Sequence, residues 1–416
     1  NASRFALMDK CQICSVEQVK VLLNFGPQPL CNRFKTAPDE EEFRHPLMLG
    51  QCQNCGLIQL INPVPPEEIV PRVEWLKYNE PEEHLNDLAE ILCNLQGLPE
   101  KPVACGITYK DDSLLRRLAE KGFEKTWRID PEKDLRISQK GVAGETVIPQ
   151  LTADSVKALV EVHGRANLIV ARHVLEHAPD THRFLAAIWD LLTPGGYVAF
   201  EVPDCTKQLK FKDYSMVWEE HILYFVPETL KASFNCTNFE LVQYRKYPYI
   251  TEDSQIAIVR KDQNKGRGAT KPIAKIFSMT EVYSGDYEEN RKKIYSYIKN
   301  YSSKIGKIAF YGAGHLSVML VNLLQIGDFI EFIVDDTEQK QGYYLPGTEL
   351  LIKSSEALEK EMISSCILCL SPEHENKILQ KHKDFVAQGG KFVSAFPIQV
   401  NSLHKFAMED SGHEYH

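Results

Sequence analysis

"ANLIVARHVLEHAPDTHRFLAAIWDLLTPGGYVAFEV", residues 166–202, contains the parts of one α/β unit in a row. Residues 166–174 are mostly apolar, which is typical of a buried strand. Residues 181–192 carry apolar side chains at helical spacing, and Asp180 is the expected N-cap of this helix. The TPGG sequence at 193–196 predicts a turn, and a second apolar strand follows at 197–202. This order of elements indicates a parallel sheet that is covered by helices.

The same alternation extends over residues 71–262, with a further helix expected at 114–123. A polar stretch rich in glycine and lysine begins at 260, and apolar side chains near helical spacing predict one long amphipathic helix over 276–304. A second strand–turn–helix–strand unit begins at Lys307. The sequence therefore predicts an α/β protein with four segments, which are 1–70, 71–262, 263–306 and 307–416.

Composition limits the classes of function. The chain has 416 residues, is 43% apolar and carries a formal net charge of −9. An acidic net charge argues against nucleic-acid binding, which needs a basic face, and no apolar run approaches the ~20 residues of a membrane span. Eleven cysteines are few for this length and favour a reducing compartment. We expect a cytoplasmic monomer or small homo-oligomer with no nucleic-acid or membrane partner.

Two CxxC pairs lie in the turn-rich first segment. Cys11 and Cys14 form one pair, and Cys52 and Cys55 form the other. Four thiolates in two short chelating pairs match the closed tetrahedral shell of a structural Zn²⁺ site. Cys31, which lies between the pairs, is expected to be a buried small side chain.

The chain resembles the three-domain sugar C-methyltransferases. The similarity rests on "FGPQPLCNRF" and "GQCQNCGLIQL" in the first segment, on "VLEHAPDTHRFL" and "WEEHILYFVPETL" in the second, and on "FYGAG", "VDDT" and "PG" in the last. That family methylates nucleotide-linked 4-keto-deoxysugars with S-adenosylmethionine. The resemblance implies a zinc-binding lobe, a class I methyltransferase domain of Rossmann type and a second, C-terminal Rossmann-like domain.

The resemblance also implies catalytic residues. His221 falls on the family's proposed base, with Glu220 beside it, and removal of a proton next to a ketone suits a histidine. His177 falls on a second family histidine, and we expect it or a tyrosine to stabilise the oxyanion. An aromatic stretch after the zinc lobe implies that Tyr78 takes part in catalysis. Further expected sugar contacts are Trp75, Trp218 and Tyr224.

The expected donor loop departs from the family pattern. "CGITYKDDSLLRR", residues 105–117, has one glycine where a glycine-rich loop normally lets the backbone approach the donor. Anchoring on the following helix aligns Gly106 with an acidic residue of the family, and anchoring on the preceding strand makes it the first loop glycine. In both alignments Tyr109, Lys110 and Asp112 occupy space that the donor normally uses. Expected donor contacts are Gly106, Asp112, Asp130 and Arg172, with Asp130 placed to hold the ribose.

The last segment contains "GAGHLS" at 312–317, which follows a strand and opens a helix. This context is typical of a nucleotide phosphate site. The resemblance implies that Gly312, Gly314, His315 and Asp335 contact the nucleotide sugar. A purely structural Rossmann-type loop is the alternative, and both are favoured over a redox cofactor such as NAD.

Three functions fit the sequence. The first is donor-dependent C-methylation of a nucleoside-diphosphate-linked 4-keto-deoxysugar. The second is a donor-independent epimerase, isomerase or eliminase acting on such a sugar through the same enolate. The third is a non-catalytic binding or scaffold protein. His84, His163 and His173 have no neighbouring motif and are interpreted as ordinary polar residues.

Overall fold

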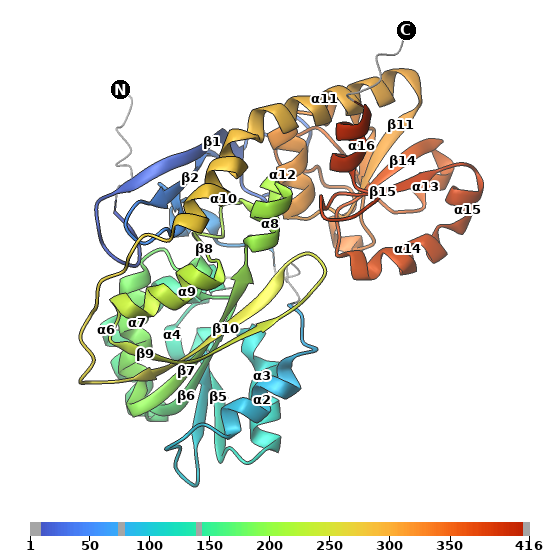
Figure 1. Ribbon diagram of the computed structural model, residues 1–416. Helices are drawn as coiled ribbons and strands as arrows, with labels where there is room; N and C mark the ends of the chain where they lie inside the picture. Colours follow the sequence, from blue (N-terminus) through green and yellow to red (C-terminus); the bar gives the residue numbers. More distant parts are fainter. Residues whose placement is uncertain (1–9, 74–79, 139–143, 411–416) are drawn as a thin grey trace. The chain divides into compact units, whose positions relative to one another are not determined.

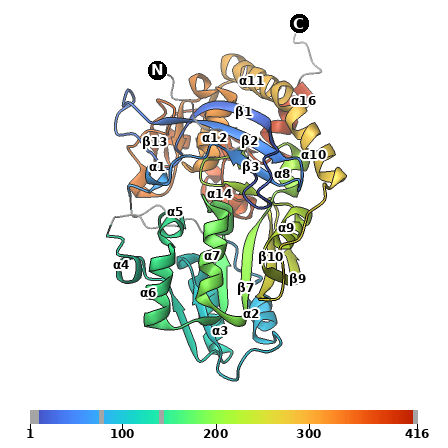
Figure 2. The ribbon, with the colours of Figure 1, turned by 90° about the vertical axis from the view of Figure 1, so that its left-hand side faces the viewer.

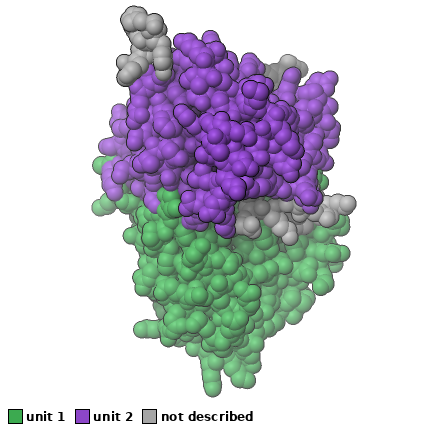
Figure 3. Space-filling model, turned by 90° about the vertical axis from the view of Figure 1, so that its right-hand side faces the viewer, with its two compact units in different colours: residues 1–21, 49–205, 220–274 green, residues 22–48, 206–219, 275–416 purple. Residues whose placement is uncertain are grey.

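The computed structural model describes residues 10–73, 80–138 and 144–410, and it divides into two compact units. The first unit comprises residues 1–21, 49–205 and 220–274, and the second comprises 22–48, 206–219 and 275–416. The two units are coloured separately in Figure 3. Among the described residues, no helix is both long and apolar enough to span a membrane.

The N-terminal lobe is built on a small sheet of order β1-β2-β3-β8. Its elements are β1 (Val19–Pro29), β2 (Arg44–Cys52), β3 (Ile58–Ile61), the short helix α1 (Pro66–Ile69) and β8 (Leu223–Tyr224). β8 comes from far along the chain and pairs antiparallel with β3 through Tyr224 and Leu223. The segment just after His221 is therefore hydrogen-bonded to the lobe.

A six-stranded sheet of order β5-β4-β6-β7-β10-β9 forms the centre of the first unit. β4 to β7 are parallel, β10 pairs antiparallel with β7, and β9 pairs antiparallel with β10. The strands are β4 (Val103–Gly106), β5 (Lys125–Arg128), β6 (Ala166–Arg172), β7 (Leu192–Asp204), β9 (Phe239–Tyr247) and β10 (Asp253–Lys261).

Helices cover both faces of this sheet, as the alternation predicted. Alternate residues of β6 face opposite sides, so that Leu168 and Val170 pack with α2 and α3 while Ile169 and Ala171 pack with α6 and α7. The two pairs of helices are seen on either side of the strands in Figures 1 and 2. The helices of this unit are α2 (Leu85–Cys93), α3 (Asp112–Glu120), α4 (Pro131–Leu135), α5 (Gly144–Val147), α6 (Ala153–His163), α7 (Thr181–Leu191) and α9 (Pro227–Ser233), with 3-10 turns η1 (Tyr109–Asp111), η2 (Ile148–Gln150), η3 (Leu175–His177) and η5 (Phe234–Cys236).

The predicted strand at 166–174 and helix at 181–192 are confirmed, and Asp180 caps α7 by accepting a bond from the Arg183 amide. The predicted TPGG turn differs in form. β7 already begins at Leu192, and its pairing with β6 shifts register between Ala166 and Leu168. Residues 193–196 are therefore an irregularity within the strand, which Gly195 permits by adopting a positive φ of 74°.

The second unit carries an all-parallel sheet of order β13-β12-β11-β14-β15. Its strands are β11 (Lys307–Tyr311), β12 (Phe332–Val334), β13 (Ile352–Lys353), β14 (Ile363–Leu368) and β15 (Lys391–Ser394). Its helices include α8 (Thr206–Phe211), α12 (His315–Leu324), α13 (Ala357–Lys360), α14 (Glu375–Lys381), α15 (Lys383–Ala387) and α16 (Leu403–Asp410), with 3-10 turns η4 (Tyr214–Met216), η6 (Gly327–Phe329), η7 (Glu338–Lys340) and η8 (Pro372–His374).

The single long helix expected over 276–304 is a wrong prediction. Two helices occupy this range, α10 (Ala274–Gly285) and α11 (Tyr287–Lys304). The break falls at Gly285 and Asp286, and Gly285 has the weakest helix propensity of the segment.

Candidate active site and metal centre

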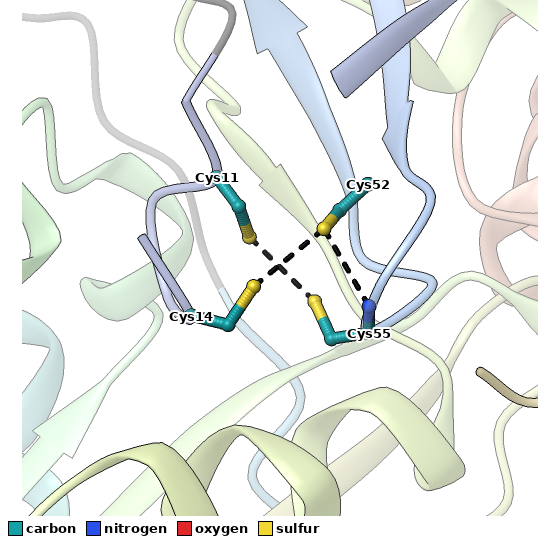
Figure 4. Close-up of side chains that lie close together, drawn as sticks. All are labelled: Cys11, Cys14, Cys52 and Cys55. Atoms are coloured by element: carbon teal, nitrogen blue, oxygen red, sulfur yellow. Dashed lines mark hydrogen bonds between the residues drawn. The ribbon is translucent and has the colours of Figure 1, made fainter. Parts of the chain in front are cut away.

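The four cysteines of the CxxC pairs converge on one point in the N-terminal lobe (Figure 4). The Sγ atoms of Cys11 and Cys55 lie 3.6 Å apart, as do those of Cys14 and Cys52, and all four lie within 4.8 Å of one another. A tetrahedral Zn²⁺ with bonds of about 2.3 Å would hold its sulfurs about 3.8 Å apart, so the thiols fit this ion.

Neighbouring N–H groups point at these sulfurs. The amide of Cys55 donates to Sγ of Cys52 over 3.5 Å, and the side-chain amide of Asn54 donates to Sγ of Cys14 over 3.6 Å. Such bonds stabilise thiolates and orient metal ligands. Cys31 is buried and is not in the group, as expected.

The loop after β4 is closed by hydrogen bonds to the carboxylate of Asp111, which belongs to the same loop. Oδ2 of the buried Asp111 accepts from the amides of Ile107 and Thr108 at 2.7 and 3.0 Å, and Oδ1 accepts from the Arg172 amide at 2.9 Å. Burial raises the pKa of Asp111 to about 6 against these bonds. Gly106 has no room for a side chain, because a Cβ there would lie 2.8 Å from Cβ of Asp111. Glycine at position 106 therefore allows the turn to pack against Asp111.

The other residues expected to contact the methyl donor differ in burial, since Arg172 is buried whereas Asp112 and Asp130 are near the surface. Arg172 is 1% exposed, and its guanidinium donates to Glu201 at 2.6 Å, to the Lys110 carbonyl at 2.7 Å and to the Pro81 carbonyl at 2.9 Å. Asp112 pairs with Arg128 at 2.7 Å on the surface. Asp130 caps α4 by accepting from the amides of Glu132 and Lys133.

Glu201, near the carboxyl end of β7, is the centre of a buried network. Besides Arg172, Ser254 donates to it at 2.7 Å, and Nε2 of His84 and of His173 lie 3.0 and 3.3 Å from Oε1. Burial alone would raise the pKa of Glu201, but the Arg172 charge outweighs it and holds that pKa below its usual range. No sequence motif singles out His84 and His173, yet both contact this carboxylate.

His177 and His221 lie together in the first unit. Their ring centroids are 4.7 Å apart and the ring planes are perpendicular. Nδ1 of His177 lies 2.8 Å from the Glu220 carbonyl and 2.8 Å from Oε1 of Glu145. A carbonyl only accepts hydrogen bonds, so Nδ1 carries the proton and Nε2 of a neutral His177 carries the lone pair.

Three carboxylates surround these imidazoles. Glu145 is 9% exposed, Glu220 is 2% exposed and Glu176 is fully buried. Ligand atoms of Glu176, His177 and His221 fall within 4.8 Å of one another, as do those of Glu145, His177 and Glu220. Glu176 lies 3.3 Å from Nδ1 of His173, yet neither of its oxygens accepts a hydrogen bond from any residue that the structure describes.

The remaining expected contacts are distributed over both units. Tyr224 is buried on β8, with its ring centroid 6.3 Å from that of His221. Tyr78 and Trp75 fall in 74–79, outside the described residues. In the second unit, Trp218 and His315 stack with centroids 4.3 Å apart.

The glycine loop of the second unit is tightly held. Gly312 has φ of 100°, and a Cβ there would lie 2.8 Å from the Cys369 carbonyl oxygen, whereas Gly314 has open space around it. Asp335 accepts from the Ala313 amide at 2.7 Å and from the Lys340 ammonium at 3.0 Å. Its carboxylate is therefore satisfied from within the unit.

The comparisons with known proteins match all three parts of the chain. Residues 11–69 match the family described as "Putative zinc binding domain", 105–244 match "Methyltransferase domain", and 274–397 match "C-methyltransferase C-terminal domain". The chain is also 24% identical over 411 residues to the C-methyltransferase NovU of Streptomyces niveus, across 94% of this chain and 96% of that protein. The chain thus has the three-domain organisation of a C-methyltransferase.

Solved structures also resemble part of this C-methyltransferase. The 1,6-didemethyltoxoflavin-N1-methyltransferase of Burkholderia thailandensis is 16% identical, with 44% of this chain and 80% of that chain covered and a TM-score of 0.30. The magnesium protoporphyrin IX methyltransferase of Synechocystis PCC 6803 is 13% identical, with 43% and 83% covered and a TM-score of 0.29.

The cofactors of the C-methyltransferase are a Cys₄-bound zinc and S-adenosylmethionine. Beside the carboxyl ends of β4 and β6, Lys110 and His173 lie 2.7 and 3.6 Å from the carboxylate of Glu80, so side chains there can bind a charged group of the kind that S-adenosylmethionine carries at its amino-acid end. Sequence reasoning missed Glu145, Glu176 and Glu201 as well as these cations. No motif marks them, because each becomes informative only through its buried partner.

Proposed function

We propose that this C-methyltransferase methylates a carbon next to the ketone of a nucleoside-diphosphate-linked 4-keto-deoxysugar. S-adenosylmethionine supplies the methyl group when it is bound. The family resemblance suggests the sugar class. The observation that carries the proposal is the perpendicular pair of His177 and His221, which is surrounded by buried carboxylates.

His221 is the proposed base. A ketone acidifies the hydrogen on the adjacent carbon, and an imidazole whose pKa lies near neutral pH removes such a proton efficiently. His221 is the more exposed of the two histidines, which suits a group that must meet substrate. The carbanion left behind is the nucleophile for the methyl group, and its charge resides largely on the ketone oxygen.

His177 is proposed to manage the charge on that oxygen. Glu145 and the Glu220 carbonyl fix its Nδ1–H, so Nε2 is the atom available to the substrate. When Nε2 is protonated it donates to the oxyanion, and the carboxylate of Glu145 stabilises the resulting imidazolium. Glu176 is proposed to accept a hydrogen bond from a sugar hydroxyl, because its buried oxygens receive none from the described residues.

The nucleotide is proposed to contact the loop of Gly312, Gly314 and His315 in the second unit, with Trp218 offering a ring that already stacks on His315. Asp335 supports this loop through the Ala313 amide. We therefore propose that Asp335 mainly positions this loop. A direct contact between Asp335 and the ribose is proposed only in addition to that role.

Proton exchange tests the base. The enzyme is incubated in deuterated water with dTDP-4-keto-6-deoxyglucose, and loss of the proton beside the ketone is followed by NMR. We expect His221→Ala to lose this exchange and His163→Ala to keep it, because His163 stacks on Trp127 elsewhere in the unit. Full exchange in His221→Ala would refute the assignment.

A further inference from the structure

The carboxyl ends of β4 and β6 lie where the strand order of the first unit's large sheet changes direction. β4 is followed in the chain by β5 on one side, and the next strand of the sheet, β6, lies on its other side. In open parallel sheets, ligands bind outside the carboxyl ends of the strands at such a change of direction. Lys110 follows β4, and His173 follows β6 directly.

A buried ion pair occupies this place. The ammonium of Lys110 lies 2.7 Å from Oε1 of Glu80, and the two side chains are 9% and 20% exposed. Nδ1 of His173 lies 3.6 Å from Oε2 of Glu80 and 3.3 Å from Oε1 of Glu176, so Glu80 faces two cations and shares one of them with Glu176. Lysine is rarely buried without a partner, and here the partner comes from a segment outside the sheet.

All three groups are charged at neutral pH. Burial alone would raise the pKa of Glu80, but the charges of His173 and Lys110 lower it to about 2. Burial alone would lower the pKa of His173, but Glu80, together with Glu176 and Glu201, raises it to about 10. The same carboxylate keeps the pKa of Lys110 above its ordinary value.

Groups other than Glu80 also hold these two residues, and the Lys110 ammonium itself donates to the His173 carbonyl at 3.5 Å. The Lys110 carbonyl accepts from the guanidinium of Arg172, and its turn is closed by Asp111. His173 adopts a left-handed φ of 49°, which is uncommon for a residue other than glycine and is found often at functional sites. Nε2 of His173 is 3.3 Å from Glu201. The structure therefore holds a preformed site for an anion.

The donor has a group of the required chemistry. S-adenosylmethionine ends in an α-carboxylate beside an α-ammonium, and in glycine-rich loops the backbone amides are free to meet an anion. Here Asp111 already takes the amides of Ile107 and Thr108. At this edge of the sheet, the charged side chains of Lys110 and His173 are therefore the groups that can bind an anion in place of backbone amides.

We propose that Lys110 and His173 bind the α-carboxylate of the methyl donor and that Glu80 occupies this site until the donor displaces it. This inference rests on the donor dependence of the proposed function. It makes Glu80 an internal competitor, so removing its charge strengthens donor binding, whereas removing the charge of Lys110 weakens it. Two variants of one ion pair thus have opposite effects, which loss of a merely structural pair would not produce.

Calorimetry with S-adenosylhomocysteine tests this directly. We expect Glu80→Gln to bind at least fivefold more tightly than wild type and Lys110→Met at least tenfold more weakly. Because Lys110→Met leaves Glu80 without its main cation, Lys110→Met/Glu80→Gln is measured as well, with the melting temperature of each variant recorded. The matched control is the surface pair of Lys121 and Glu90, 2.5 Å apart, whose variants Lys121→Met and Glu90→Gln should bind as wild type does.

A second ligand shows whether the carboxylate is the group that is recognised. 5′-Methylthioadenosine lacks the amino-acid end, so its affinity should be the same in wild type, Glu80→Gln and the double variant. Unchanged or weaker binding of S-adenosylhomocysteine by Glu80→Gln overturns the inference while leaving methylation by the wild type intact. Equal changes for both ligands also overturn it. If neither the wild type nor any variant binds either ligand, the donor dependence of the proposed function fails, and this inference fails with it. Binding by Glu80→Gln alone supports the inference strongly.

Discussion

At the scale of single residues, Glu145 determines how His177 can act. It lies 2.8 Å from Nδ1 of His177 and is itself buried, so it fixes both the ring orientation and the tautomer. Burial alone would raise the pKa of Glu145, but the charge of His177 lowers it, so the carboxylate stays ionised beside the ring.

We therefore expect Glu145→Gln to lower kcat about tenfold to hundredfold, less than the roughly 10²–10⁴ that a complete acid–base group contributes. KM should change little, and Glu145→Asp should recover part of the rate. The measurement is the pH dependence of kcat, with the exposed Glu132→Gln as control. A fall in KM and kcat together, with an unchanged pH profile, would assign Glu145 a structural role only.

His173 makes stability depend on pH. Its pKa is about 10 in the folded chain against an ordinary 6.5, so the stabilisation is complete below 6.5 and is lost as pH rises toward 10. A difference of one between the folded and unfolded pKa corresponds to about 1.4 kcal/mol of unfolding free energy. Urea unfolding at pH 6.5, 8 and 9.5 should show falling stability, and His173→Asn, which tolerates the left-handed backbone, should flatten the trend. An equal decline in this variant would contradict the assignment.

The same residues show how far sequence reasoning reaches. Cys11 and Cys52 could be identified because CxxC spacing alone indicates the ligand geometry, whereas the catalytic role of His221 stays a prediction that rests on the family resemblance. Glu145 and Glu201 could not be identified, since their roles depend on burial against histidines that are distant in the chain. The expected contacts of Tyr78 and Trp75 stay predictions.

At the scale of elements, the sequence predicted a strand or helix correctly where its apolar spacing began and ended together with clear boundary signals. The strand at 166–172 and helix α7 follow from apolar spacing and an Asp cap. The long helix failed because its apolar pattern continues across Gly285, where α10 ends and α11 begins shortly afterwards at Tyr287. The turn at 193–196 became part of β7, since pairing with β6 continues on both sides of it.

The zinc knuckles give a prediction at this scale. Metal binding by four thiolates contributes directly to folding, so losing one ligand should release the ion and unfold the lobe. We expect about one zinc per chain in wild type, little in Cys14→Ser, and a lower melting temperature for that variant. Cys31→Ser is the control, because Cys31 lies in the same segment but outside the group of four. Full zinc content in Cys14→Ser would refute the site.

At the scale of the whole molecule, the sequence order of zinc lobe, methyltransferase sheet and C-terminal sheet is confirmed by the three matched ranges. The boundaries at 70, 262 and 306 stay predictions. The structure groups residues differently, since 22–48 and 206–219 belong with the C-terminal sheet. Such grouping depends on contacts between distant segments, which composition and periodicity along the chain do not reveal.

The proposed activity of the whole enzyme is transfer of a methyl group to carbon. The most direct measurement incubates the enzyme with methyl-¹³C-labelled S-adenosylmethionine and dTDP-4-keto-6-deoxyglucose and follows the label by ¹³C NMR. We predict a labelled methyl group on the carbon beside the ketone, absent with His221→Ala. Label that stays on the donor while the sugar proton exchanges fully with solvent would contradict methyl transfer.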